Sequence, residues 1–506
     1  MTLNPIRSVV IVGGGTAGWM SAALLAKLMP AGAPYRPSIT LIESDDIGTI
    51  GVGEATIPAI KRFNELLELN EVEFMKATKA TFKLGIEFRD WGWIGNSYMH
   101  GFGKIGQDLG WLRMHQYWLK MRGTGQVSDN FADYSINTAA AYGNRFTKPQ
   151  GEMKKSPLSE IAYAYHFDAG LFARFLREFS ETRGVVRTEG KITHPDLDPE
   201  TGFVTAVTLE SGARIEGDLF IDCSGFRGLL IEQALHSGYE DWSQWLPCDR
   251  AVAVPCANAP DLSPYTRSTA TTAGWRWRIP LQHRIGNGHV YSSRFISDDE
   301  ATANLMQGLE GEALAEPRII RFETGKRRQI WQRNVVAIGL SSGFIEPLES
   351  TSIQLIQSGI LRLINLWPDR GFARSTVAEF NTQTDFDVER IRDFIIAHYK
   401  VSRRDDSAMW RYCRDMDVPD SLKRKLDEFG VMGRVYKDKE ELFAEESWIQ
   451  VLIGQGLIPA AYDPFVDVQP EAKIAGYLNN IAGVVRKCVD YLPHHGDFVA
   501  NYCPSQ

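Results

Sequence analysis

The stretch that most constrains the fold is an apolar run that breaks into glycines, Ser8-Val-Val-Ile-Val-Gly-Gly-Gly-Thr-Ala-Gly18. Branched residues without alternation are typical of a parallel strand buried on both faces. Gly13, Gly15 and Gly18 then fit the pattern G-x-G-x-x-G. Its glycines allow a tight turn, close approach of backbone amides to a pyrophosphate, and close packing of a helix on the strand. The stretch predicts a strand, a phosphate-binding turn that includes Thr16 and Ala17, and a helix whose N-terminus faces the phosphate.

A second segment, Ser38-Ile-Thr-Leu-Ile-Glu43, supports a nucleotide site. It is another strand of the buried type, and its terminal carboxylate could accept a hydrogen bond from a ribose hydroxyl. The glycines that follow, Gly48, Gly51 and Gly53, predict an extended strap, continued by Ala55, that could lie against a flat cofactor ring. A flexible loop is the alternative for this strap.

Composition excludes several classes of protein. A net charge of -8 argues against nucleic acid as a partner. The six cysteines and ten histidines show no C-x-x-C pair and no H-E-x-x-H, so we expect no metal. Neither a signal segment nor an apolar run of about 18 residues is evident, so we expect a cytoplasmic protein without a membrane anchor.

The order of the later segments favours an α/β fold that binds FAD. After a helix at 167–182 come a strand at 184–188, a hairpin at 204–215 and a buried strand ending in a glycine turn at 218–228. This order matches the second half of large Rossmann-like FAD-binding folds of the p-hydroxybenzoate-hydroxylase type. No second G-x-G-x-x-G follows a strand, so another protein would have to reduce the flavin. We expect an FAD core at 1–365 with a β-rich insertion at about 241–333, and a mostly helical region at 366–506, packed as one unit.

A third cofactor segment runs from a buried strand through Gly339 and Leu340 to a loop with Glu346 and Glu349. Ser350 or Thr351 then caps a helix. The amides around Thr351 and Ser352 predict a site for a small anion. A carboxylate at position 349 would be unusual there if only stability mattered.

Two further strands carry chemistry-bearing side chains. In the alternating run 80–91, Lys83 shares a face with charged residues, and the pattern alone predicts a solvated lysine. The run Gly274-Trp-Arg-Trp-Arg-Ile-Pro280 places both indoles on one face of a strand and both arginines on the other. Taken alone, His100 in the loop that follows Trp93 is more often structural than catalytic.

Together these segments resemble the flavin-dependent tryptophan halogenase family over nearly the whole chain. The resemblance rests on Gly13-x-Gly15-x-x-Gly18, Thr81-Phe-Lys83, Gly274-Trp275-x-Trp277-x-Ile279-Pro280 and Glu346-Pro-Leu-Glu349-Ser-Thr351. It implies that a separate flavin reductase supplies FADH2, which reacts with oxygen to a flavin hydroperoxide. Halide held at Thr351 and Ser352 would then yield hypohalous acid.

The resemblance also implies roles for individual side chains. Lys83 would hold the oxidant and aim it at an aromatic carbon, and Glu349 would take the proton that this carbon releases. Trp275 and Trp277 would line the passage, which excludes direct monooxygenation. His100 and Phe102 match the pair that sandwiches indole in the family.

Two departures from the family bear on the ligands. Ser352 replaces a glycine, which leaves chloride and bromide both open, and Trp448-Ile449 replaces a tyrosine pair that grips the amino acid. We therefore predict an indolic substrate rather than free tryptophan, which remains the alternative. The chain could form a homodimer. A flavin aromatic monooxygenase and a non-enzymatic flavin-binding protein are rivals from other classes; neither needs Lys83.

Overall fold

The chain divides into two units, each assembled from three separated segments. The computed structural model describes residues 4–30, 32–34, 36–47, 53–154, 156–258 and 262–505. Unit 1 comprises residues 1–80, 167–249 and 321–389, and unit 2 comprises residues 81–166, 250–320 and 390–506. Gly48 and Gly51 of the predicted strap lie outside the described residues.

A six-stranded sheet organises unit 1, in the order β20-β21-β12-β1-β2-β8. The glycine-motif strand β1 (Ser8–Val12) lies between β2 (Ser38–Glu43) and β12 (Leu219–Asp222) and pairs with both in parallel. Residues 9–12 are at most 3% exposed, as the uninterrupted branched run predicts for a strand buried on both faces. The other sheet strands are β8 (Val185–Glu189), β20 (Trp331–Gln332) and β21 (Val335–Ala337).

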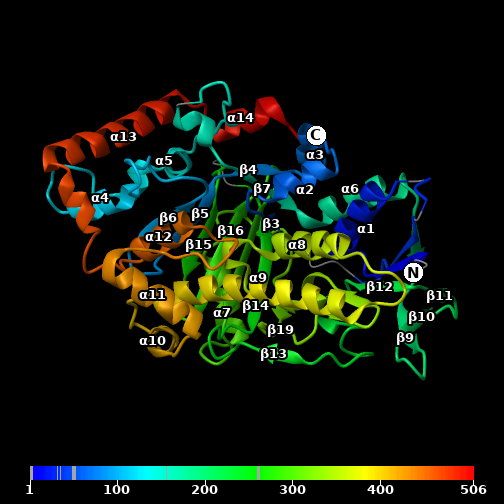
Figure 1. The fold of residues 1–506 in the computed structure, drawn as a ribbon. Helices are drawn as coiled ribbons and strands as arrows, with labels where there is room; N and C mark the ends of the chain where they lie inside the picture. Colours follow the sequence, from blue (N-terminus) through cyan, green and yellow to red (C-terminus); the bar gives the residue numbers. More distant parts are fainter. Residues whose placement is uncertain are drawn as a thin grey trace. The chain divides into compact units, whose positions relative to one another are not determined.

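Helices cover this sheet and carry the loops of the nucleotide site. Helix α1 (Thr16–Leu28) lies beside α6 (Ala169–Glu181), and it also contacts α8 (Ser352–Asn365) (Figure 1). The remaining elements of unit 1 are β3 (Gly53–Ala55), α2 (Ile60–Leu66), α3 (Glu71–Ala77), β9 (Ile192–Leu197), β10 (Val204–Leu209), β11 (Arg214–Glu216), β13 (Tyr239–Asp241), β19 (Gly325–Arg327), β22 (Gly343–Phe344) and the first part of α9 (Arg374–Lys400).

A seven-stranded sheet organises unit 2, in the order β18-β14-β17-β16-β15-β5-β6. Four consecutive strands of this sheet each pair antiparallel with the next: β14 (Arg250–Cys256), β17 (Ile285–Tyr291), β16 (Gly274–Pro280) and β15 (Thr266–Ala270). Strand β15 then pairs in parallel with β5 (Gly85–Arg89). Helix α7 (Asp298–Gln307) contacts β14 and β17, and Ala301 and Leu305 pack there in a buried cluster with Val252.

The remaining elements of unit 2 include most of the C-terminal helices (Figure 1). They are β4 (Thr81–Lys83), β6 (Ser97–Gly101), α4 (Met114–Met121), α5 (Ile136–Tyr142), β7 (Ala164–Asp168), β18 (Arg318–Arg321), α10 (Ala408–Asp415), α11 (Asp420–Met432), α12 (Glu445–Gly454), α13 (Glu471–Tyr491) and α14 (His495–Tyr502).

One local prediction was wrong. The run 80–91 is not one strand, because the Leu84 amide leaves the strand direction and donates to the Pro264 carbonyl, which separates β4 from β5. Helix α11 ends at Met432, where Gly433 at φ 66° supplies the left-handed cap.

Candidate functional site

The glycine turn between β1 and α1 has the geometry of a phosphate cradle. Gly13 has φ 112°, and a Cβ on Gly18 would lie 1.9 Å from the Gly13 carbonyl oxygen, so the helix start and the turn pack too closely for a side chain. At Gly15, the N-cap of α1, a Cβ would meet nothing within 4 Å, and no side chain caps the helix. Open space beside helix amides that no side chain caps fits the pyrophosphate of FAD.

The Glu43 carboxylate, at the end of β2, has side-chain partners that the sequence did not predict. One carboxylate oxygen accepts a hydrogen bond from Trp19 Nε1 at 3.3 Å, and the other lies against the guanidinium groups of Arg187 and Arg177. A Cβ on Gly14 would lie 1.6 Å from this carboxylate. Gly14, which the motif leaves unspecified, is therefore what lets Glu43 approach the turn.

The sequence did not single out Asp222 at the end of β12. Its buried carboxylate accepts backbone hydrogen bonds from Ser224, Leu230 and Ile231 at 2.8–3.0 Å, which closes the loop after the strand. The Cys223 carbonyl in this loop lies where a Cβ on Gly13 would need to be. Asp222 therefore shapes the wall of the phosphate turn, and its place as the last residue of a buried strand was the available signal.

The loop that the sequence assigns to halide begins beside the same helix. A Cβ on Gly339, the residue before Leu340, would lie 2.8 Å from the Ala17 side chain, so this turn meets the start of α1. Glu346 and Glu349 are 0% and 1% exposed. The Ser350 backbone is left-handed at φ 59°.

Helix α8 starts directly after this left-handed residue. Thr351 is its N-cap but makes no side-chain capping hydrogen bond, which differs from the predicted cap. Amides at the start of α8, from Ser352 onward, are thus not capped by a side chain, an arrangement that favours an anion.

Within the described residues, the predicted strap contains one ionisable side chain, Glu54. In β3, burial raises the pKa of the Glu54 carboxyl from its usual 4.5 to about 7. Gly53 and Ala55 on either side are buried. The strap segment is therefore apolar enough to favour the neutral form of its only carboxylic acid.

Lys83 is not the solvated lysine that alternation alone predicts. Its side chain is 0% exposed in β4, and its Nζ lies 5.4 Å from the centroid of the Phe102 ring. Strand β4 pairs with β7, where Lys83 lies opposite Ala164. Lys83 is therefore a buried cation beside an aromatic face and not a charge that faces solvent.

His100 lies in an aromatic cluster with two residues that the sequence did not suggest. Its ring centroid lies 5.7 Å from that of Phe394 and 6.2 Å from that of Phe443, and these two phenylalanines stack at 3.9 Å. Trp448 meets Phe394 edge-on at 4.8 Å and is 1% exposed. Gln450 fixes the strand end beside His100 through two 3.0 Å hydrogen bonds to the Gly101 backbone.

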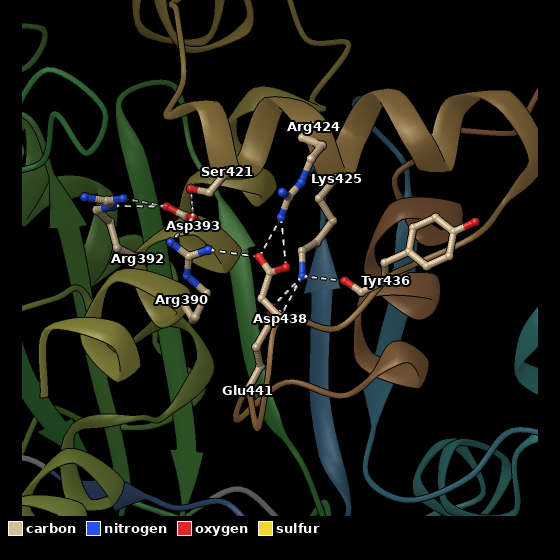
Figure 2. Close-up of polar contacts among 9 residues, drawn as sticks. All are labelled: Arg390, Arg392, Asp393, Ser421, Arg424, Lys425, Tyr436, Asp438 and Glu441. Carbon is tan, nitrogen blue, oxygen red and sulfur yellow. Dashed lines mark hydrogen bonds and ion pairs between the residues drawn. The ribbon is translucent and has the colours of Figure 1, made fainter. Parts of the chain in front are cut away.

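Ion pairs fix the segment that carries Phe443 (Figure 2). The Lys425 ammonium donates to both oxygens of Glu441 at 2.8 and 2.9 Å, and the pair is almost fully buried. Asp438 accepts from Arg424 at 2.7 Å and from Arg390 at 3.4 Å. These acidic side chains therefore already have cationic partners.

Trp275 and Trp277 share one face of β16, as their spacing predicts. Their ring centroids are 6.2 Å apart, while Arg276 on the other face donates to the Asn304 carbonyl of α7. A Cβ on Gly288 would lie 2.0 Å from the Trp277 ring. The Trp277 ring therefore lies against β17 at Gly288, where there is no room for a side chain.

The parallel sheet, the glycine turn and Glu43 define an FAD-binding α/β protein. Comparison with known proteins identifies the family within this class. The family profile for tryptophan halogenase matches residues 8–471. The chain is 35% identical to tryptophan 6-halogenase SttH of Streptomyces toxytricini over 99% of this chain and 98% of that protein.

Two solved flavin-dependent halogenases have closely similar structures. Xcc4156 from Xanthomonas campestris superposes with a TM-score of 0.95 at 46% identity, covering 100% of this chain and 99% of that one. BrvH from Brevundimonas sp. BAL3 gives a TM-score of 0.94 at 48% identity, covering 99% and 100%.

The chain belongs to the flavin-dependent tryptophan halogenase family. It is an enzyme that uses reduced FAD and a halide, and members of the family need a separate flavin reductase. The predicted fold class and cofactors are confirmed. In the part of the chain that the structure describes, no helix has the length and apolar character needed to cross a membrane.

Proposed function

We propose that this enzyme halogenates indole or a small uncharged indole derivative rather than free tryptophan. The observation that carries the proposal is the state of the acidic residues in the segment 438–446, which carries Phe443. Asp438 and Glu441 are ion-paired with Arg424 and Lys425, and Glu440 between them is exposed. The acidic residues that follow, at 445 and 446, lie 2.9 and 3.9 Å from Arg113.

A free amino acid would bring an ammonium group that needs a carboxylate partner once water is excluded. Taking Glu441 from its buried pair leaves Lys425 uncompensated, which costs about 3–5 kcal/mol. The pairs of Arg424 and Arg113 are partly exposed and cost less to break. An indole ring makes no such demand and gains from stacking on His100 and Phe102. The aromatic contacts therefore favour the ring, and the ion pairs disfavour the amino acid.

In the proposed reaction, bound FADH2 with oxygen and halide supplies an electrophilic halogen as hypohalous acid. The Lys83 ammonium donates a hydrogen bond to the oxygen of this acid and orients the halogen toward the ring. The carbon–halogen bond forms as the oxygen–halogen bond breaks, and the departing hydroxide takes a proton from the Lys83 ammonium and leaves as water. Glu349 accepts the proton lost from the same carbon, which restores aromaticity.

The flavin turn and the halide loop complete the proposal. Gly13, Gly15 and Gly18 hold the pyrophosphate, Glu43 binds the ribose, and Leu340 and the strap contact the flavin. Thr351 and Ser352 bind chloride or bromide, and Trp275 with Trp277 line the passage. A cytoplasmic location and a homodimer remain predictions of the same proposal.

The test is a competition between equal concentrations of indole and tryptophan, with FAD, a flavin reductase, oxygen, chloride and bromide, analysed by mass spectrometry. We expect halogenated indole as the main product and at least a hundredfold loss with Lys83→Met, whereas Lys76→Met at an exposed lysine matches the wild type. Faster halogenation of tryptophan would refute the substrate. Oxygen instead of halogen in the product would indicate the monooxygenase alternative.

A further inference from the structure

Strand β4 is too short to fix a buried lysine through sheet pairing alone. Three residues, 81–83, pair with β7, and the chain then turns away at Leu84. What holds the strand is a set of buried polar contacts made by the two residues before Lys83. Their partners lie on β7, β16 and α14, and Thr266 of β15 in turn contacts the β7 partner His166.

The Thr81 hydroxyl determines which nitrogen of His166 carries a proton. Thr81 Oγ1 donates its single hydrogen to the Pro280 carbonyl at 2.7 Å, since a carbonyl can only accept. The 3.0 Å contact between Thr81 Oγ1 and His166 Nδ1 must then be donated by the ring. His166 therefore carries its hydrogen on Nδ1.

The other ring nitrogen, His166 Nε2, lies 3.0 Å from Thr266 Oγ1. Burial, with the positive charges of Lys83 and Arg278 and the nearby His495, lowers the pKa of His166 well below its usual value. The neutral ring then accepts a hydrogen bond from Thr266. Donation runs in one direction, from Thr266 to His166, to Thr81, and to the carbonyl of Pro280.

A second buried histidine holds the next residue of the strand. His495 Nδ1 donates to the Leu262 carbonyl at 2.7 Å, so its Nε2 can accept the Phe82 amide at 3.2 Å. Burial lowers the pKa of His495 to about 4. Two neutral histidines thus fix the strand without adding positive charge beside the Lys83 ammonium.

We propose that His166 is a positioning residue for Lys83: with Thr81 and Thr266 it fixes β4 to Pro280, the last residue of the strand that carries Trp275 and Trp277. The inference rests on the proposed role of Lys83. We call this series of hydrogen bonds, from Thr266 through His166 and Thr81 to Pro280, the relay. It keeps Lys83 in place relative to the two tryptophans on β16. Loss of the relay should let the oxidant escape before it reaches the ring.

Matched variants separate the two sides of the relay. His166→Asn keeps a donor near the position of Nδ1 and so retains the bond to Thr81, whereas His166→Gln reaches toward Thr266 and loses it. Thr81→Ser keeps the hydroxyl, and Thr81→Val removes it at nearly constant volume. All four are compared with the wild type and with Lys83→Met.

The measurements are kcat and KM for indole, the oxidant captured by a β-diketone trap, and the thermal transition. We expect His166→Gln and Thr81→Val to lose at least tenfold in kcat, with KM within about twofold and more trapped oxidant per flavin oxidised. His166→Asn and Thr81→Ser should stay within about threefold of the wild type.

Wild-type kcat and trapped oxidant in Thr81→Val and His166→Gln would overturn the inference. So would equal losses in both members of each pair that follow the thermal transition, because these indicate a purely structural role. If His166→Gln does not fold, the Thr81 pair decides. Full activity of Lys83→Met would instead refute the proposed function.

Discussion

Replacing Gly15 and Gly18 with alanine, one at a time, separates the cofactor role of the phosphate turn from its packing role. Gly15 has φ -74° and ψ -173°, a backbone conformation that alanine adopts freely, and its Cβ would meet no atom within 4 Å. We expect Gly15→Ala to cost the cofactor-free protein at most about 1 kcal/mol, the scale of a weakened N-cap. The new methyl would occupy the space beside the helix amides.

The FAD affinity should therefore fall in Gly15→Ala although the fold is unaffected. A methyl that holds the pyrophosphate away from the amides should raise the Kd for FAD at least tenfold, about 1.4 kcal/mol. Gly18→Ala is different, because its Cβ would lie 1.9 Å from the Gly13 oxygen where an ordinary contact needs 3.4 Å. Overpacking of this kind costs about 1–3 kcal/mol, and it should appear without FAD as well.

Urea unfolding of the cofactor-free protein and titration of FAD by flavin fluorescence measure the two effects separately. Gly476→Ala, where a Cβ would also meet nothing within 4 Å, is the control for adding a methyl group. Equal loss of stability in Gly15→Ala and Gly18→Ala, or wild-type FAD affinity in both, would refute the assignment of the turn.

Three further changes test the described contacts. Burial raises the pKa of Glu54 in the folded state to about 7, so the unfolded state loses this proton at a lower pH than the folded state does. The free energy of unfolding should therefore fall as pH rises from about 4.5 to 7, by at most about 3 kcal/mol because the side chain keeps some exposure. Glu54→Gln should remove this pH dependence in urea titrations. Gly288→Ala should cost about 1–3 kcal/mol, and Trp277→Ala in the same chain should remove most of that cost in a double-mutant cycle. Lys425→Met should cost about 3–5 kcal/mol by leaving Glu441 buried without its partner, and Glu441→Leu in addition should recover most of it.

Two of these changes have a control at an exposed position. Glu65→Gln should leave the pH dependence of stability unchanged, and Lys423→Met, which breaks an exposed pair with Asp427 on the same helix, should cost about 0.5 kcal/mol or less. A Gly288→Ala cost that persists when residue 277 is alanine would contradict the clash with the indole. A Lys425→Met cost no larger than that of Lys423→Met would contradict the buried pair.

Local sequence patterns predicted the burial and the faces of those strands for which the residue types alone imply the surroundings. The branched run at 9–12 predicts a doubly buried strand because every side chain needs an apolar neighbour. The alternation of Trp275 and Trp277 with arginines predicts a shared face because side chains in a strand alternate. Both are confirmed.

The surroundings of Lys83 could not be predicted this way because its strand is held by distant residues. Leu84 bonds to Pro264, Thr81 to Pro280, and the Phe82 amide to His495. No local periodicity encodes partners about 180–410 residues away. The same reason explains why Glu43 but not Arg187, and His100 but not Phe394, stood out in the sequence.

The division of each unit into three chain segments has a consequence for synthesis on the ribosome. Strand β1 pairs with residues 219–222, and β12 needs residues 335–337 as its other neighbour. Strand β5 emerges early but pairs with residues 266–269, and the Phe82 amide of β4 donates a hydrogen bond to His495 of α14. Unit 1 cannot close before residue 337 is made, and unit 2 cannot close before residue 495 is made.

Long stretches of the nascent chain therefore carry unpaired strand edges and apolar side chains while later segments are still being translated. Such states aggregate readily, and chaperones that cover apolar surface shield them. Because α14 also fixes the strand of Lys83, a chain released without α14 would lose a contact that holds this strand even if the flavin turn formed. The contacts that hold the strand of the proposed catalytic lysine are thus complete only after residue 495 has been translated.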